Sequence, residues 1–233
     1  MSKKELVVII NGAGTNGMEL KSLYKKLAEN EKYFVYYPGF LPGVFTGDYF
    51  PKSTTKDFIR FTDETIEMIN QFDTVYLIGY SLGASTTAII AAKCKNIKKL
   101  VLMAPIVKNP NYSKFLRWLS YSVAYDKNLT RVQKIFFSEF IKRFIKVPKI
   151  HVWHLQKYLL YTRKFLKQIT QPTLIVETIH DELVKTRSVD MIERVIKNDS
   201  VERYPVDSSH FLLFDKLVRN DVVEKIARYL EEE

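Results

Sequence analysis

The residues best suited to chemistry lie in segment 79–83, Gly-Tyr-Ser-Leu-Gly, where one residue separates the serine from a glycine on each side. The segment follows an apolar run over residues 74–78 and precedes a small-residue stretch over 84–92, which is typical of a strand that turns directly into a helix. Such a turn can hold the serine in a strained backbone with its hydroxyl exposed. Ser81 is therefore the candidate nucleophile, against the alternative of an ordinary serine in a tight turn.

A serine hydroxyl becomes a useful nucleophile when a base takes its proton and a carboxylate orients that base. Asp181 follows a short β-type run at residues 172–178, and His210 follows a second run at 201–206. Ligand-facing loops leave the carboxyl ends of parallel strands. The order along the chain therefore predicts Asp181 as the acid and His210 as the base.

Other residues compete for the role of the acid. Glu182 and Asp207 stay open as alternatives, although Asp181 comes first after its strand. His210 is the only histidine after Asp181. We expect the remaining histidines to be structural: His151, His154 and His180.

The same chemistry needs backbone N–H groups that stabilise the oxyanion of a tetrahedral intermediate. One comes from the residue after the nucleophile, here Leu82, and the other from the loop after the first strand, where Ala13 is the candidate. That loop, residues 12–17, also matches the dinucleotide-binding pattern GxGxxG. The expected second strand at 33–37 ends without the carboxylate that would bind a ribose, which disfavours this alternative.

Together these residues resemble the α/β-hydrolase superfamily, and most closely its small bacterial carboxylesterases and monoacylglycerol lipases with an inserted cap. The resemblance runs from Asn11 and Ala13 through segment 79–83 to Asp181 and His210. It implies a serine hydrolase that cleaves carboxylic esters through an acyl-enzyme, with no metal or organic cofactor. The alternatives are a thioesterase with the same triad and a non-catalytic binding protein of this fold. The chain departs from the family in having Asn11 and Ser209 where members commonly have His and Gly.

The pattern of elements predicts an α/β fold with a mostly parallel sheet flanked by helices. Residues 1–107 and 169–233 are expected to form the hydrolase core, and residues 108–168 an inserted helical cap. Among the expected elements are a helix over 18–30, a second helix opened by a capping box at 54–57, and a loop over 38–53 that rims the site.

The expected cap contains all of the protein's excess positive charge. Residues 108–168 hold 14 Lys or Arg against two acids, a local net charge of +12, while the complete chain is +10. The same stretch contains 13 of the 31 aromatic residues. Packed aromatics with solvating lysines would explain this composition, and so would an acyl pocket beneath a positive face that contacts anionic lipid. The charge comes without a nucleic-acid-binding motif, so we expect no nucleic-acid partner.

The single cysteine, Cys94, rules out an intrachain disulfide and fits a reducing compartment. The apolar runs are far shorter than a membrane span. A cytoplasmic location is therefore expected. The expected partner is a small-molecule acyl ester, the substrate that the resemblance implies.

Overall fold

The computed structural model describes residues 5–15, 17–38, 53–196 and 201–232. Six parallel strands form one sheet in the order β2-β1-β3-β4-β5-β6. They are β1 (Glu5–Ile10), β2 (Tyr33–Tyr36), β3 (Val75–Tyr80), β4 (Ile97–Met103), β5 (Thr173–Thr178) and β6 (Val201–Val206). The predicted α/β fold with a parallel sheet is confirmed.

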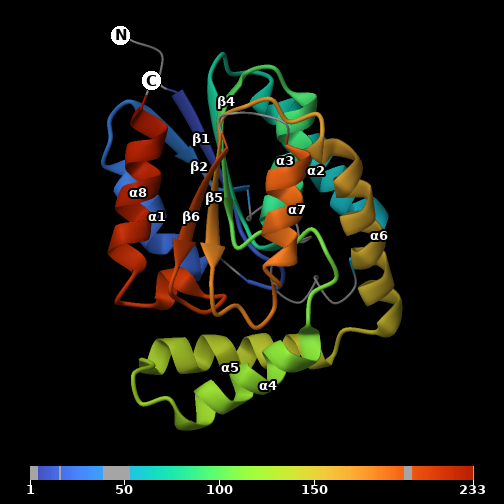
Figure 1. Ribbon diagram of the computed structural model, residues 1–233, viewed down its shortest axis with the longest axis vertical. Coiled ribbons are helices and arrows are strands. Elements are labelled where there is room, and N and C mark those ends of the chain that lie inside the picture. The colour runs from blue at the N-terminus through green and yellow to red at the C-terminus, as the bar shows by residue number, and fades with distance from the viewer. Residues whose placement is uncertain (1–4, 16, 39–52, 197–200, 233) are drawn as a thin grey trace.

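Helices cover both faces of this sheet (Figure 1). One face is covered by α1 (Lys21–Ala28) and α8 (Arg219–Glu231), and the other by α2 (Thr55–Ile69), α3 (Leu82–Lys93), α6 (Lys149–Leu166) and α7 (Arg187–Val195). The remaining helical elements are η1 (Met18–Leu20), α4 (Tyr112–Tyr125), α5 (Arg131–Ile145) and η4 (Leu212–Phe214). Because the sheet is covered on both sides, strands β3 and β5 are buried along their whole length.

The expected start of the second helix is confirmed. The Thr54 hydroxyl accepts from the Asp57 N–H (3.3 Å), and the Asp57 carboxylate accepts from the Thr54 N–H (2.9 Å). This reciprocal pair satisfies two N–H groups that a helix end would otherwise leave without a partner. The helix expected over residues 18–30 is present as the short η1 turn followed by α1. Most of the expected rim loop, residues 39–52, lies outside the described residues.

The three helices of residues 108–168 take two different places. Figure 1 shows α4 and α5 lying across the carboxyl ends of the strands, whereas α6 runs beside α2 and α3. The buried Tyr158 hydroxyl joins α6 to both neighbours, with hydrogen bonds to Thr62 (3.0 Å) and Thr86 (2.9 Å). The division into a core and a cap insertion stays a prediction. Within the described ranges, no helix has both the length and the apolar character needed to cross a bilayer.

Candidate active site

Ser81 lies at the sharp turn between β3 and α3. Its φ of 57° and ψ of −117° place a side chain in a region that L-residues rarely adopt, at a cost of about 1–3 kcal/mol. The Ser81 N–H donates to the Met103 carbonyl oxygen on β4 (2.8 Å), and the Ser81 carbonyl oxygen accepts from the Ile106 N–H (3.3 Å). Neighbouring backbone thus holds the strained conformation that the motif predicts.

The two glycines of the motif allow the helix to pack closely against the sheet. A Cβ on Gly79 would lie 2.6 Å from the Ala84 Cα, and one on Gly83 would lie 2.5 Å from the Asn11 carbonyl oxygen. Both separations are below normal contact, and the atoms concerned are backbone, which cannot easily move away. These positions therefore require glycine for the serine to be presented as it is.

Three side chains from distant parts of the chain form one hydrogen-bonded line. The Nε2 atom of His210 is 3.0 Å from the Ser81 Oγ, and its Nδ1 atom is 2.8 Å from the Asp181 Oδ2. An ionised carboxylate can only accept, so Nδ1 carries the proton and Nε2 of the neutral ring is free to accept from the serine hydroxyl. The structure therefore brings together all three residues of the predicted triad, in the tautomer that activation of the serine requires.

The carboxylate of Asp181 is held by several donors besides His210. Its Oδ2 accepts from the Thr178 hydroxyl (2.5 Å), and its Oδ1 accepts from the N–H groups of Leu183 (2.9 Å) and Val184 (2.7 Å). Burial acts to raise the pKa of Asp181, but the attraction to His210 and these hydrogen bonds outweigh it and lower that pKa below its ordinary value. The group therefore stays ionised and orients the imidazole.

The alternative acids lie elsewhere. Asp207 pairs with His180 at 2.9 Å on the exposed surface. Glu182 has a buried oxygen, Oε2, without a hydrogen-bond partner among the described residues, and burial raises its pKa. In the described hydrogen bonds, Asp181 is the carboxylate that contacts His210.

The other two histidines make local contacts near the start of α2. The Nδ1 of His151 is 3.0 Å from the Ser53 carbonyl oxygen, and the Nδ1 of His154 is 3.1 Å from the Thr55 hydroxyl. Neither contact involves the residues around Ser81.

Ala13 and Leu82, the two expected oxyanion donors, line the same small cavity as Ser81 and His210. Leu82 is the first residue of α3, where N–H groups have no acceptor within the helix and the helix dipole is positive. The Ala13 loop packs directly on the nucleophile, since a Cβ on Gly12 would lie 3.1 Å from the Ser81 Cβ. These positions suit two donors to an oxygen bound beside Ser81.

Residues that sequence reasoning missed hold the histidine in place. The buried Tyr80 hydroxyl donates to the His210 carbonyl oxygen (2.8 Å), and the rings of Phe115 and Phe211 contact the imidazole at centroid separations of 5.6 and 5.7 Å. Tyr80 is the residue before Ser81 in the motif, so its position was visible in the sequence, but its partner lies 130 residues away.

The cavity at Ser81 is nearly closed. Its free volume is about 20 Å³, which is enough for about one water molecule. Three aromatic side chains of α4 and α5 are part of the wall: Tyr112, Phe140 and Phe144. An acyl group needs more space than this, so side chains of the lining must move when a substrate reaches the serine.

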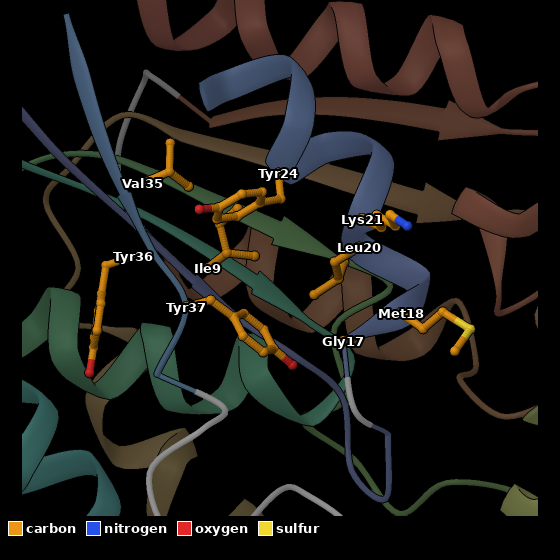
Figure 2. Close-up of a pocket in the computed structure, with 9 residues that line it drawn as sticks. All are labelled: Ile9, Gly17, Met18, Leu20, Lys21, Tyr24, Val35, Tyr36 and Tyr37. Atoms are coloured by element: carbon orange, nitrogen blue, oxygen red, sulfur yellow. The ribbon is translucent and has the colours of Figure 1, made fainter. Parts of the chain in front are cut away.

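A larger cavity of about 680 Å³ lies between η1, α1 and β2, away from the triad (Figure 2). Its wall is mostly apolar, with Tyr24, Tyr37 and Lys21 among the lining residues, whereas Figure 2 shows the Tyr36 side chain pointing away from the other labelled residues. The lining contains no residue of the triad. Over the described part of the chain, no three His, Cys, Asp or Glu side chains are grouped so that they could hold a metal ion.

Comparison with known proteins shows which solved structures have a similar fold. No model of a protein family and no curated protein sequence matches the chain. Among solved structures, it is similar to a structure from work on LipS and LipT, two metagenome-derived lipolytic enzymes. The TM-score is 0.74 at 16% identity, covering 99% of this chain and 95% of the other. It is also similar to a Paleococcus ferrophilus monoacylglycerol lipase, with a TM-score of 0.67 at 16% identity and coverage of 97% and 93%.

A third similar structure is the thioesterase domain from the curacin biosynthetic pathway, with a TM-score of 0.66 at 14% identity and coverage of 97% and 92%. These matches extend over nearly the whole of each chain. At such identities the likeness concerns the fold, and the chain has the α/β-hydrolase fold.

Proposed function

We propose that this protein of the α/β-hydrolase fold is a serine hydrolase that cleaves carboxylic esters. The observation that carries the proposal is the line from Ser81 through His210 to Asp181, with separations of 3.0 and 2.8 Å. A strained serine, a base in the required tautomer and a buried, ionised carboxylate occur together. Such a constellation is recognised by its geometry and not by its order in the sequence.

The chemistry proceeds in two halves. In the first, the Ser81 oxygen attacks the acyl carbonyl carbon while its proton moves to Nε2 of His210, and Asp181 stabilises the imidazolium. The N–H groups of Ala13 and Leu82 bind the oxyanion. The tetrahedral intermediate expels the alcohol, which takes the proton from His210, and leaves an acyl-serine. In the second half, water gives a proton to His210 and its oxygen attacks the acyl carbon. The bond between the acyl carbon and the Ser81 oxygen then breaks, His210 returns the proton to that oxygen, and the carboxylic acid leaves.

Labelling with a fluorophosphonate probe tests the nucleophile directly, because the probe phosphonylates an activated serine with loss of fluoride and leaves ordinary hydroxyl groups unmodified. We expect one equivalent of probe on Ser81, located by mass spectrometry of the proteolysed protein, together with hydrolysis of p-nitrophenyl esters. A protein that takes up no probe and hydrolyses no ester would contradict the proposal and favour a non-catalytic binding protein of the same fold.

A second cavity adjoins the one at Ser81 and offers room for an acyl chain. It has a free volume of about 120 Å³ and shares Tyr112, Phe144 and Leu155 with the catalytic cavity. These shared side chains form the wall between the two spaces. Outward movement of Phe144 would join them into one apolar pocket of modest size.

This pocket predicts a chain-length optimum. Each acyl methylene that enters it contributes about 0.8 kcal/mol until the space is full, so kcat/KM should rise over the first few carbons and then fall. Phe144→Ala removes part of the dividing wall, and the optimum should move to longer chains in a series of p-nitrophenyl esters. Phe34→Ala is the matched control, because Phe34 is an exposed phenylalanine of β2. A profile highest for acetyl esters in both proteins would contradict this placement of the acyl group.

A thioester would undergo the same two steps at the same triad, and one similar structure is a thioesterase domain. The leaving group separates the two activities. Our proposal is an oxygen ester. The test compares kcat/KM for an acyl ester and an acyl thioester that carry the same acyl chain. A higher kcat/KM for the thioester would reassign the substrate class.

We also propose that α4 and α5 contact anionic lipid. Five apolar side chains of these helices are between 56% and 70% exposed: Tyr121, Tyr125, Val132, Ile135 and Ile145. They are interspersed with basic residues in a stretch of net charge +12. Exposed apolar and aromatic groups among lysines are typical of a surface that binds at the interface of a charged bilayer. The same helices cover the active site, so binding there would bring it close to lipid esters.

Vesicle sedimentation tests this surface. We expect binding to vesicles that contain phosphatidylserine at low salt. Binding should be much weaker at physiological salt, where the Debye screening length is about 8 Å. Replacing Lys127 and Arg131 with Gln should weaken binding severalfold, whereas the matched pair Lys25→Gln and Lys95→Gln on the body should not. If the wild-type protein does not bind anionic vesicles at low salt, the proposal is wrong.

A further inference from the structure

A buried carboxyl group lies behind the loop that carries Ala13. Glu19, on the η1 turn, is 2% exposed, and its Oε1 lies 2.5 Å from the Thr15 hydroxyl. Its second oxygen, Oε2, is buried without a hydrogen-bond partner among the described residues. The catalytic steps above do not use this group. Burying a carboxylate with an oxygen that accepts no hydrogen bond costs folding free energy. Such a group is therefore expected to be neutral or to have a role in the active site.

The Thr15 hydroxyl has more acceptors around it than it has protons. It lies 3.1 Å from the Gly12 carbonyl oxygen and 2.5 Å from the Glu19 Oε1, and it accepts from the Asn11 amide (3.0 Å). A hydroxyl has one hydrogen to donate. If Glu19 is ionised, its carboxylate competes with the Gly12 carbonyl for that hydrogen. If Glu19 is protonated, it donates to Thr15, and Thr15 donates to Gly12 while accepting from Asn11 and Glu19.

The bond to Gly12 bears directly on the oxyanion donor. The Gly12 carbonyl and the Ala13 N–H belong to one planar peptide group, so holding the carbonyl oxygen fixes the direction of the N–H. The Asn11 amide also donates to this oxygen (3.1 Å). Thr15 supplies the second of the two hydrogen bonds, and it can do so only while Glu19 does not take its hydrogen.

We propose that Glu19 is a positioning residue for the oxyanion loop: its protonated carboxyl donates to Thr15, and this directs the Thr15 hydrogen to Gly12 and orients the Ala13 N–H. The inference rests on the proposed function. Its consequence is a pH-dependent latch on the oxyanion donor, closed while Glu19 is neutral and loosened when it ionises.

The surroundings of Glu19 place that change near neutral pH. Burial raises the pKa of Glu19 to about 7, against the hydrogen bond from Thr15 and the attraction to His210, which lower it. The titratable groups that face it are Tyr37 after β2, Tyr80 on β3 and His210 after β6. Arg143 of α5 also contacts the loop, where it donates to the Gly14 carbonyl oxygen (3.4 Å). The latch is therefore closed below about pH 7 and opens as the pH rises through that value.

The test compares kcat of Glu19→Gln with that of the wild type as a function of pH. The amide of Gln donates to Thr15 at every pH, so the variant keeps the latch closed where wild-type Glu19 ionises. We expect the ratio of kcat, variant over wild type, to rise about tenfold between about pH 6 and about pH 8.5, because a displaced oxyanion donor costs rate in the transition state. The ratio of KM should stay constant.

Matched variants separate this role from a general loss of charge or packing. Glu29→Gln makes the same change on an exposed residue after α1, and its ratio should be flat with pH. Thr15→Ser keeps the hydroxyl and should keep the pH response, whereas Thr15→Val removes the hydroxyl and should abolish it. These two variants also carry the test if Glu19→Gln does not fold. A flat or falling ratio for Glu19→Gln would overturn the proposal, as would equal pH responses in the two Thr15 variants.

Hydrogen exchange gives a reading that does not depend on turnover. Protection of the Ala13 and Gly14 N–H groups should fall above about pH 7 in the wild type relative to Glu19→Gln at the same pH. Equal protection at every pH would overturn the latch. If the wild-type protein shows no hydrolysis that depends on Ser81, the proposed function is wrong. The two failures are therefore distinguishable.

Discussion

Replacing Ser81 with alanine should lower kcat for ester hydrolysis by roughly 10⁴-fold or more, because the triad acts as a unit and loses its reacting atom. Fluorophosphonate labelling should disappear with it. The fold should persist, since the Ser81 side chain contributes one hydrogen bond, to His210, while its backbone is held by Met103 and Ile106. The measurement is single-turnover hydrolysis of a p-nitrophenyl ester beside a thermal melt.

Ser120→Ala serves as the control for this variant, because Ser120 is an exposed serine of α4. It should retain wild-type kcat and labelling. Substantial activity in carefully purified Ser81→Ala protein would mean that the chemistry takes place at another residue, and the assignment of the nucleophile would then be wrong.

Asp181→Asn should lower kcat by about 10⁴-fold through the tautomer of His210. The Oδ1 of Asp181 accepts from the N–H groups of Leu183 and Val184, so an asparagine at this position must keep its oxygen there. Its amide hydrogens then point at His210. The Nδ1 of His210 is forced to accept, the ring proton moves to Nε2, and Nε2 can no longer take the proton of Ser81.

The other carboxylates supply matched controls for this prediction. Glu182→Gln and Asp207→Asn each remove one carboxylate charge, and each should change kcat by less than about tenfold, because neither side chain contacts the imidazole of His210 in the described hydrogen bonds. The measurement is kcat of the three variants at one pH. A larger loss in either control than in Asp181→Asn would reassign the acid.

We expect ester hydrolysis to change when lipid binds, because the same two helices contribute to the catalytic cavity and to the proposed lipid-binding surface. The catalytic cavity holds about 20 Å³ of free space, and its lining includes Tyr112, Phe140 and Phe144 of α4 and α5, the helices that also carry the exposed apolar residues. Helices that bind an interface through their outer side chains can shift their inner ones. Comparing hydrolysis of a soluble ester with and without phosphatidylserine vesicles would measure this coupling.

Much of the fold was predictable because its signals are local. The glycines around Ser81 mark a turn that few other residues allow, and the capping box at Thr54 begins a helix where one was expected. Strand ends at Asp181 and His210 were visible as short β-type runs. In a parallel sheet, all carboxyl ends meet at one edge, so the order of strands and loops was enough to predict that these three residues converge.

Other features depended on distances between residues far apart in the chain. The sequence placed three carboxylates near the histidine loop, and the separation of 2.8 Å between Asp181 and His210 distinguishes one of them. The division that assigns residues 108–168 to one helical cap insertion stays a prediction, and only the structure shows that α6 lies beside α2 and α3, which the hydroxyl of Tyr158 joins to it. Helical periodicity reveals which face of a helix is apolar, but it carries no information about which apolar surface that face will meet.

The sequence by itself determined that Ser81 stands on a strained turn at the edge of a parallel sheet and that an acid and a base follow at neighbouring strand ends, because turn chemistry and strand patterning act over a few residues. Only the tertiary structure decided which acid orients His210, how little space remains around the serine, and that Glu19 lies buried against Thr15 behind the oxyanion loop. These last properties arise from burial and from contacts between distant segments. They exist only once the chain has packed.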